Sequence, residues 1–349
     1  MTLSHRMTGY AVASAAIAAS ILAYRLLKRI SQEIPTEWEG IGTLKSIYFY
    51  PLKSGAPLDV ESVFCAEVGL MTLEDTGESN RTQLRDRSFL IFNEKHKEFK
   101  TARHYPKIML IKLTPYDRNT VALDAPAMET IYVKIPADEI QTKCITLFEK
   151  ETVLTVDCGQ EVATWLSKFL LNEDFGLRLG YNDGSLKRDI EKYYKAFTRY
   201  YADFTNQAGG LYSDLVSVSV INQASIDDCN SRIGDTTITA ANYRNNLLVT
   251  GPGLRPFDED HWDFIKVGGV VLKNVKECVR CQMPTIDPKT AVKHPKGEPF
   301  KTLNTGQEAR RLYQERFPST VIADRPTCSN VHGRLTGANY HLKGAHRTF

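Results

Sequence analysis

Short runs of alternating apolar and polar residues recur along most of the chain, and each run is bounded by turn-forming residues. This pattern predicts β-strands, because successive side chains of a strand face opposite sides of a sheet. In the first half the predicted strands are 41–50, 62–68, 88–93, 108–114, 120–123, 130–135 and 146–156. Their spacing predicts a mostly antiparallel barrel or sandwich.

A different periodicity follows in 157–172, where apolar residues repeat at helical spacing and Asp157 can cap the first turn. This helix is expected to serve packing rather than chemistry. The second half then predicts strands at 215–221, 247–250 and 267–275, with a short helix over 222–233. We therefore expect two domains, 40–175 and 176–316, in a chain whose 349 residues exceed one ordinary core.

The two ends of the chain differ from this body. Residues 7–24 carry no charge, and a helix of that length would span roughly 27 Å, close to the hydrocarbon thickness of a bilayer. Arg25, Lys28 and Arg29 follow it, which places the body on the cytosolic side. Residues 1–30 are therefore predicted to be an anchor or targeting segment; a cleaved secretory peptide is the alternative. Residues 317–349 are polar and lack strand periodicity, which predicts an atypical, disordered C-terminus.

Composition narrows the function classes. Hydrophobic residues at 42% and charged residues at 24% are typical of a folded soluble body. A net charge of +3 gives no general case for nucleic acid as a partner. Seven mostly isolated cysteines indicate a reducing compartment rather than a disulfide scaffold.

The segment 277–288 concentrates candidate chemistry, because Cys278 and Cys281 follow the predicted strand 267–275. A thiol there could be a metal ligand, a nucleophile, a redox partner or a small core residue. A zinc site lacks a second pair of ligands, and Pro284 and Pro288 disfavour the helix that a thioredoxin-like dithiol needs. The residues alone leave the other roles open.

Three basic clusters elsewhere could bind an anion. Lys53 and Ser54 follow a strand, although an ordinary surface turn is equally compatible. Arg87 belongs to a charge triplet that could also be a salt-bridged strand end. Arg244, with amides on both sides and Asn246 beside it, is suited to grip a phosphate or a pterin.

Taken together, these motifs resemble the MOSC-domain proteins, specifically the mitochondrial amidoxime reducing components. The resemblance covers roughly 41–303. It rests on Arg280-Cys281 with Thr285-Ile286-Asp287-Pro288, on Tyr50-Pro51-Leu52-Lys53-Ser54, on Leu84-Arg85-Asp86-Arg87, on Thr101-Ala102-Arg103 and on Asn242-Tyr243-Arg244-Asn245-Asn246. Arg103 is expected to be structural or a charge at the pocket rim.

The resemblance implies an α+β fold in which an N-terminal β-barrel-like domain precedes a mostly antiparallel β-barrel MOSC domain, behind one transmembrane helix. It implies that Cys281, and not Cys278, ligates molybdenum held by a pterin dithiolene. Asp287 and Thr285 would support that loop. The residues implied to hold the phosphate and pterin of the molybdopterin cofactor are Lys53, Ser54, Arg87, Arg244, Asn246 and Arg280.

The implied activity is reduction of amidoximes, hydroxylamines or N-oxides. The chain has no glycine-rich dinucleotide fingerprint in a strand–turn–helix context, so electrons from NADH would arrive through cytochrome b5 and its reductase. The N-terminal segment resembles the signal anchors of the mitochondrial outer membrane, with the endoplasmic reticulum as the alternative.

This sequence departs from the family pattern at three places. Leu215 and Val216 replace hydroxyl-bearing residues, Tyr243 and Asn245 replace Phe and Pro, and the closing strands are expected to be missing. Two other hypotheses stay open: a sulfur carrier with a persulfide on Cys281, and a non-catalytic, membrane-tethered binding protein.

Overall fold

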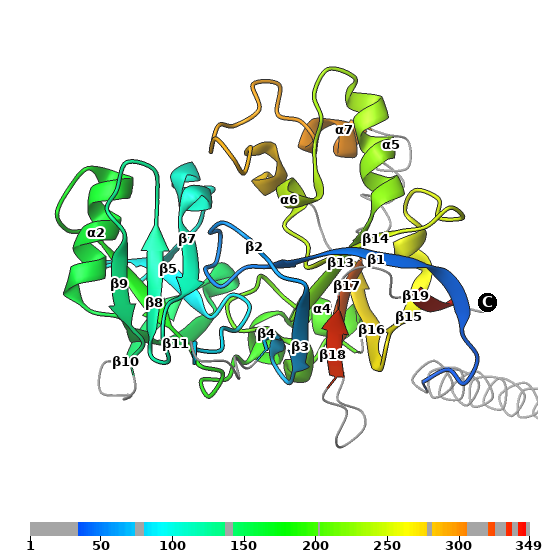
Figure 1. Cartoon of the computed structure of the whole chain (residues 1–349), viewed down its shortest axis with the longest axis horizontal. Helices are drawn as coiled ribbons and strands as arrows, with labels where there is room; N and C mark the ends of the chain where they lie inside the picture. The colour runs from blue at the N-terminus through cyan, green and yellow to red at the C-terminus, as the bar shows by residue number, and fades with distance from the viewer. Residues whose placement is uncertain are drawn as a thin grey trace, which may run out of the picture. The chain divides into compact units, whose positions relative to one another are not determined.

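The computed structural model describes residues 34–73, 80–136, 142–201, 203–277, 281–305, 320–324, 333–336 and 341–346 (Figure 1). The chain divides into Met1–Trp38 and one larger compact unit, Glu39–Phe349. Within the described residues, no helix has the length and apolar character needed to cross a bilayer. The membrane span predicted at 7–24 lies outside the described residues.

Seven of the described strands pair into a closed ring in the order β1, β14, β13, β17, β16, β15, β19 and back to β1. Neighbours are antiparallel, except that β13 and β14 are parallel. The bounds are β1 Glu39–Phe49, β13 Val218–Asn222, β14 Leu247–Thr250, β15 Trp262–Val267, β16 Val270–Glu277, β17 Thr320–Asp324 and β19 His341–His346. The predicted β-rich fold with an antiparallel barrel is confirmed.

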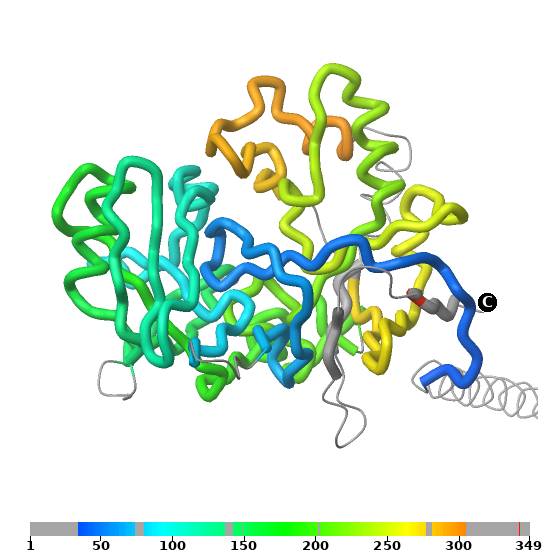
Figure 2. Tube along the Cα trace, in the orientation of Figure 1, coloured from blue at the N-terminus to red at the C-terminus, as the bar shows by residue number. Residues whose placement is uncertain are grey.

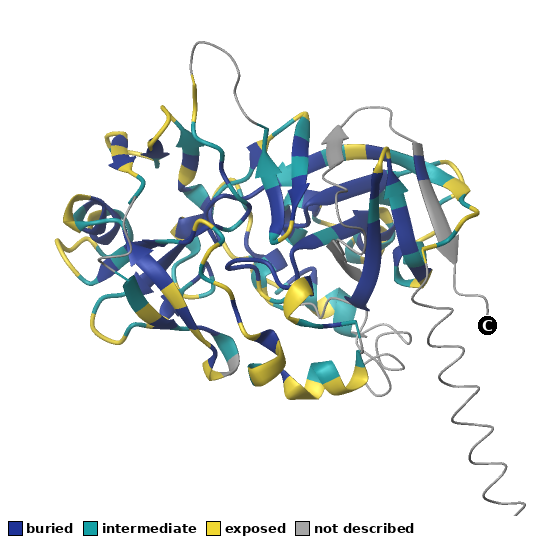
Figure 3. Cartoon of the chain, turned by 90° about the horizontal axis from the view of Figure 1, so that it is seen from below, coloured by how far each residue is buried: buried dark blue, intermediate teal, exposed yellow. Residues whose placement is uncertain are grey.

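The first strand of the unit closes this ring. Thr43 pairs with Thr250 in β14, although the two residues lie 207 positions apart in the sequence (Figure 2). The same strand continues to β2, Leu58–Asp59. Buried residues concentrate in the strands of the ring (Figure 3), and Phe49, Ile91 and Val220 share one hydrophobic core. Strands from both halves of the chain are therefore held together by one core.

The C-terminal segment differs from the expectation of a strandless, disordered tail. The structure forms β17 between β13 and β16, β19 between β15 and β1, and β18, Gly333–Thr336, beside β3. Leu342 of β19 is fully buried. Sequence alternation missed these strands because a strand placed between two others is stabilised by its partners as much as by its own residues.

The rest of the first half forms smaller sheets. A five-stranded sheet has the order β10, β11, β12, β5, β6, and two three-stranded sheets have the orders β7, β8, β9 and β18, β3, β4. Their bounds are β3 Ser62–Ala66, β4 Gly69–Thr72, β5 Phe89–Asn93, β6 Phe99–Lys100, β7 Lys112–Pro115, β8 Thr120–Asp124, β9 Ile131–Lys134, β10 Thr142–Thr146, β11 Thr152–Asp157 and β12 Leu177–Tyr181.

Two predicted strands are interrupted by 3-10 turns. The region 108–114 begins inside η1, Pro106–Leu110, where proline suits the first helical positions. The region 146–156 is broken by η3, Phe148–Lys150, which reverses the chain between β10 and β11. The other short helical elements are α3 Ile190–Tyr193, α4 Lys195–Tyr200, η4 Asn206–Ala208, α6 Ala240–Tyr243, η5 Asp258–His261, η6 Met283–Thr285 and α7 Phe300–Thr305.

Two longer helices match their predictions. The helix α2, Gln160–Leu171, packs against β12, although its cap position is Gly159 rather than Asp157. The helix α5, Gln223–Ile233, begins after Asn222, whose side chain accepts a hydrogen bond from the backbone of Ala224 as a helix cap.

A buried carboxyl anchors the start of α5. Glu259 is 2% exposed. Its carboxyl group accepts a hydrogen bond from the Asn222 backbone at 3.2 Å and hydrogen bonds from the Ser225 hydroxyl at 2.8 Å. Burial, aided by the charge of Asp260, raises the pKa of Glu259 from 4.5 to about 7. The folded protein therefore favours the protonated form of this side chain.

We predict that this carboxyl makes stability fall as pH rises from 4.5 to about 7. In that range the unfolded chain has lost the proton that the folded chain keeps, which lowers the free energy of unfolding by about 3 kcal/mol. Urea unfolding across this range should show that Glu259→Gln loses this part of the pH dependence, whereas the exposed control Glu173→Gln keeps it. Parallel pH profiles of wild type and Glu259→Gln would contradict the prediction.

Candidate functional site

The site begins at the turn that follows β1. Lys53 and Ser54 are each 5% exposed. The backbone of Lys53 donates to the carbonyl of Phe89 at 2.8 Å, and the backbone of Phe89 donates to Pro51 at 3.0 Å. The turn is therefore fixed against the start of β5, and it places a lysine inside the protein rather than on the surface.

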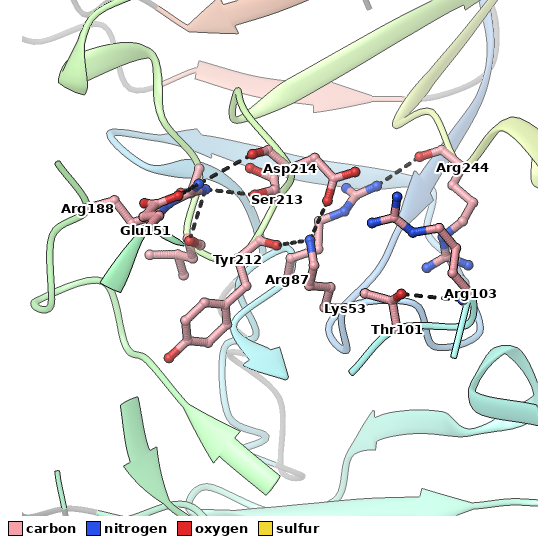
Figure 4. Close-up of polar contacts among 12 residues, drawn as sticks. Lys53, Arg87, Thr101, Arg103, Glu151, Arg188, Tyr212, Ser213, Asp214 and Arg244 are labelled. Atoms are coloured by element: carbon pink, nitrogen blue, oxygen red, sulfur yellow. Dashed lines mark hydrogen bonds and ion pairs between the residues drawn. The ribbon is translucent and has the colours of Figure 1, made fainter. Parts of the chain in front are cut away.

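The Lys53 ammonium has two protein acceptors (Figure 4). Its Nζ donates to the carbonyl of Tyr212 at 2.6 Å and to the carboxylate of Asp214 at 2.5 Å, and the side chain of Asp214 is 60% exposed. Burial lowers the pKa of Lys53, although the charge of Asp214 opposes this shift. The charge of Lys53, together with the charges of Arg103 and Arg87, lowers the pKa of the exposed Asp214 carboxyl. Because an ammonium has three N–H groups, one is left for a ligand.

Arg87 lies at the end of the next turn and is held on several sides. Its guanidinium donates to the adjacent carboxylate of Asp86, to the Asn246 side chain at 3.1 Å and to the carbonyl of Arg244 at 2.8 Å. Its backbone donates to the carbonyl of Tyr50 at 2.6 Å. Burial raises the pKa of Asp86, which the charge of Arg87 opposes. These bonds fix the position of the guanidinium before any ligand binds.

Asn246 makes hydrogen bonds to several parts of the protein. Its Nδ2 donates to the carbonyl of Tyr48 and to the carboxylate of Asp86, both at 3.1 Å. Its Oδ1 accepts from Arg87 and from the backbone and hydroxyl of Ser219. An amide has two donor hydrogens and two lone pairs, so the protein uses all of them. Asn246 therefore positions Arg87, and its contact with a cofactor stays a prediction.

Arg244 contrasts with these saturated groups. It follows α6 and is 9% exposed, yet both terminal nitrogens of its guanidinium are buried without a hydrogen-bond partner among the described residues. The guanidinium carbons of Arg244 and Arg87 lie 4.3 and 4.6 Å from the ring centroid of Tyr50. Burial, together with the charge of Arg87, lowers the pKa of Arg244 to about 10. A buried cation without a partner is unfavourable, so this arrangement is suited to an anion.

Three predicted site residues also share an uncommon backbone conformation. The φ angles of Ser54, Arg87 and Arg244 are 68°, 51° and 58°, in the left-handed region. This conformation costs about 1–3 kcal/mol for a residue with a side chain and is concentrated at functional sites. The fold maintains it at Arg87 and Arg244, where the Arg87 guanidinium donates to the Arg244 carbonyl, and at Ser54 beside the buried Lys53.

A buried ion pair that the sequence did not reveal supports the Lys53 side of the site. The Arg188 guanidinium donates to the Glu151 carboxylate at 2.7 and 2.6 Å and to the carbonyl of Ser213 at 2.7 Å (Figure 4). Both side chains are almost fully buried. The pair fixes the backbone beside Tyr212 and Asp214. No local signal indicates it, because the partners lie 37 positions apart.

Cys281 lies in the loop before η6 and is half-exposed. Its Sγ accepts a hydrogen bond from the backbone of Met283 at 3.4 Å. Asn242 of α6 donates to the carbonyls of Pro284 and Ile286 at 3.3 and 3.5 Å. The loop with Cys281 is thus tied to the short helix that ends at Arg244.

The same loop meets the first half of the chain. Ile286 and Met283 pack with Ala102 and Met109. Thr285 donates to the carbonyl of Gln282 at 2.7 Å, in keeping with its predicted support of the loop.

Asp287 has an equally local role. Its side chain accepts from the backbones of Lys289 and Thr290 at 2.7 and 3.0 Å. Arg280 and Cys278 lie outside the described residues.

The structure therefore links Lys53, Arg87 and Arg244 around one cationic region and ties the Cys281 loop to it through Asn242. Within the described ranges, no group of three His, Cys, Asp or Glu side chains could hold a metal ion. The buried, unpaired guanidinium of Arg244 fits a group that carries a phosphate.

Two domain-family models match the chain. The MOSC N-terminal beta barrel domain matches residues 41–173, and the MOSC domain matches residues 211–321. These matches define the chain as a MOSC-domain protein and confirm the resemblance drawn from its motifs.

Curated relatives narrow this class. Mitochondrial amidoxime-reducing component 1 of Mus musculus is 30% identical over 302 residues, which cover 86% of this chain and 82% of the relative. The protein of the same name from Danio rerio is 33% identical, over 76% of this chain and 74% of the relative. The one from Homo sapiens is 30% identical, over 78% of this chain and 75% of the relative. The chain belongs to the family of amidoxime-reducing components.

We predict that Glu151→Gln destabilises the protein strongly, because it leaves the buried Arg188 without its carboxylate. Removing one partner of a buried pair typically lowers the free energy of unfolding by about 3–5 kcal/mol. Denaturant unfolding should show this loss. The matched control Glu67→Gln breaks the exposed Lys187 pair, and is expected to change stability by less than about 1 kcal/mol. Equal effects of the two substitutions would be incompatible with the role of the buried pair.

Proposed function

We propose that this protein is a molybdenum-cofactor-dependent reductase of N-hydroxylated compounds such as amidoximes, hydroxylamines and N-oxides. Membership of the amidoxime-reducing component family supports the reaction class. The observation that carries the proposal is the pair of unpartnered, buried nitrogens on Arg244, next to Arg87 and above the Tyr50 ring. A phosphate-bearing cofactor is the kind of ligand that such a site requires.

In this proposal the chain holds the cofactor at two ends. Lys53, Ser54, Arg87 and Arg244 bind its phosphate and pterin, and Arg280 contributes from outside the described residues. Cys281 supplies a thiolate ligand, which suits a metal already bound by dithiolene sulfur. When bound, the molybdenum cofactor supplies the two-electron chemistry that removes the N-hydroxy oxygen.

The side chains of the protein prepare these positions in advance. Asn246 holds Arg87 in place, and the Tyr212 carbonyl and Asp214 hold the ammonium of Lys53. The Met283 backbone donates a hydrogen bond to Cys281, whose half-exposed thiol is accessible to a ligand. Because these donors are fixed before binding, little reorganisation is needed when a charged ligand arrives.

Electron delivery is proposed to follow the family: NADH reduces cytochrome b5 reductase, which reduces cytochrome b5, which reduces this protein. Residues 7–24 would anchor the chain in the mitochondrial outer membrane, with the body in the cytosol; the endoplasmic reticulum is the alternative membrane. The names of the relatives support a mitochondrial location. Anchoring the three proteins to one surface would raise their effective concentration.

We predict that Cys281→Ala abolishes reduction of benzamidoxime by reduced cytochrome b5, because it removes the thiolate ligand. The loss in kcat/KM should exceed the roughly 10- to 100-fold effect typical of residues that only support a metal ligand. Elemental analysis of the same preparations should show stoichiometric molybdenum in wild type. The control Cys144→Ala removes an exposed thiol on β10, and is expected to keep both molybdenum and activity.

Two results would contradict this assignment. Molybdenum-dependent activity that survives in Cys281→Ala would show that another residue holds the metal. Wild-type protein that lacks molybdenum but carries an extra sulfur atom on Cys281, detected by mass spectrometry, would instead support a sulfur carrier.

A further inference from the structure

Arg103 is a fourth cation of this region whose partner is not provided by the described part of the chain. It lies in the turn between β6 and η1, where its backbone donates to the Thr101 hydroxyl at 3.3 Å. The backbones of His104 and Tyr105 donate to the Thr101 carbonyl at 2.8 and 3.0 Å. The turn therefore fixes the direction in which the Arg103 side chain leaves the backbone.

An aromatic platform holds the side chain. The guanidinium carbon of Arg103 lies 4.5 Å from the ring centroid of Phe148. Phe148 is itself fixed by an edge-to-face contact with Phe99, at 4.5 Å between centroids and 80° between planes. A guanidinium stacked on a ring keeps its N–H groups free at the edge, where they can bind a carboxylate or a phosphate with two hydrogen bonds.

The surroundings of Arg103 lack a matching negative charge. The Lys53 ammonium lies 5.5 Å from the same Phe148 ring, so two cations share one platform. Asp214 is near enough for Arg103 to lower its pKa, but its carboxylate is bonded to Lys53. No carboxylate among the described side chains pairs with the Arg103 guanidinium. Lys53 and Arg103 thus place two positive charges at the Phe148 ring, and Asp214 supplies one negative charge. The remaining positive charge favours a bound oxyanion.

The position of Arg103 indicates which ligand carries that oxyanion. Arg103 is half-buried, whereas Lys53 and Arg244 are at least nine-tenths buried. Its neighbour Ala102 packs with Met283 of the Cys281 loop. Arg103 therefore lies beside the loop that carries Cys281 and is more exposed than Lys53 and Arg244, which are drawn with it in Figure 4.

We propose that Arg103, stacked on Phe148, is a specificity-determining residue that binds a carboxylate or phosphate group on the N-hydroxylated substrate. This inference rests on the proposed reductase function. It narrows the substrate class to N-hydroxylated compounds that carry an anionic group some distance from the reacting nitrogen.

The test compares benzamidoxime with 4-carboxybenzamidoxime, which differ by one carboxylate. In Arg103→Gln, the ratio of kcat/KM for the carboxylated compound to that for the neutral compound should fall about 10- to 100-fold, as expected for loss of a charge-assisted hydrogen-bonded pair. Arg103→Lys keeps the positive charge, so its ratio should lie between those of wild type and Arg103→Gln. Phe148→Leu keeps the arginine but removes its platform, and should lower the ratio less than Arg103→Gln. Arg118→Gln, at an exposed arginine between β7 and β8, is the matched control.

A second readout does not depend on turnover. Dissociation constants of both compounds, measured by calorimetry without an electron donor, should show the same selective loss in Arg103→Gln, with molybdenum content equal to that of wild type. An unchanged ratio and unchanged dissociation constants would overturn the proposal. A lower molybdenum content with equal losses for both compounds would also overturn it, because Arg103 would then hold the cofactor. Wild-type protein that reduces neither compound would contradict the proposed function, while the binding measurement would still test Arg103.

Discussion

The site depends on the burial of the Arg244 guanidinium, whose two terminal nitrogens have no hydrogen-bond partner within the described ranges of the chain. The Tyr50 ring supports it on one face and also contacts Arg87, so two positive charges lie on one aromatic side chain. Such an arrangement is unfavourable in isolation, because burial weakens hydration of both cations. A bound anion would offset the cost of burying these cations. The surrounding residues hold both guanidinium groups in position before an anion binds.

The groups that position the cations come from distant parts of the chain. Asn246, at the start of β14, holds Arg87 from the turn before β5, and the Arg188–Glu151 pair fixes the backbone that accepts the Lys53 ammonium. The first strand brings Tyr50 and Lys53 to this point because it closes a ring formed mostly by the second half of the chain. Closure of the barrel and assembly of the site are therefore the same structural event, and the two halves cannot complete the site separately.

The strands and helices that depend on the pattern of neighbouring residues were predictable from the sequence. Alternation identified β1, short strand-like runs identified β8 and β14, and the cap at Asn222 with helical spacing identified α5. The motifs also contain Arg87 and Arg244, which contact each other in the structure; their role in holding a cofactor stays a prediction. Contacts between distant residues were not predictable: the Arg188–Glu151 pair, the saturated amide of Asn246 and the strands β17 and β19 all depend on tertiary partners.

The most direct measurement of the central claim is a crystal structure of the full chain purified with its bound group. We expect phosphate oxygens within about 3 Å of both terminal nitrogens of Arg244, the usual distance for a charge-assisted hydrogen bond. A structure in which a protein side chain or only water occupies that position, while the bound group lies elsewhere, would contradict it.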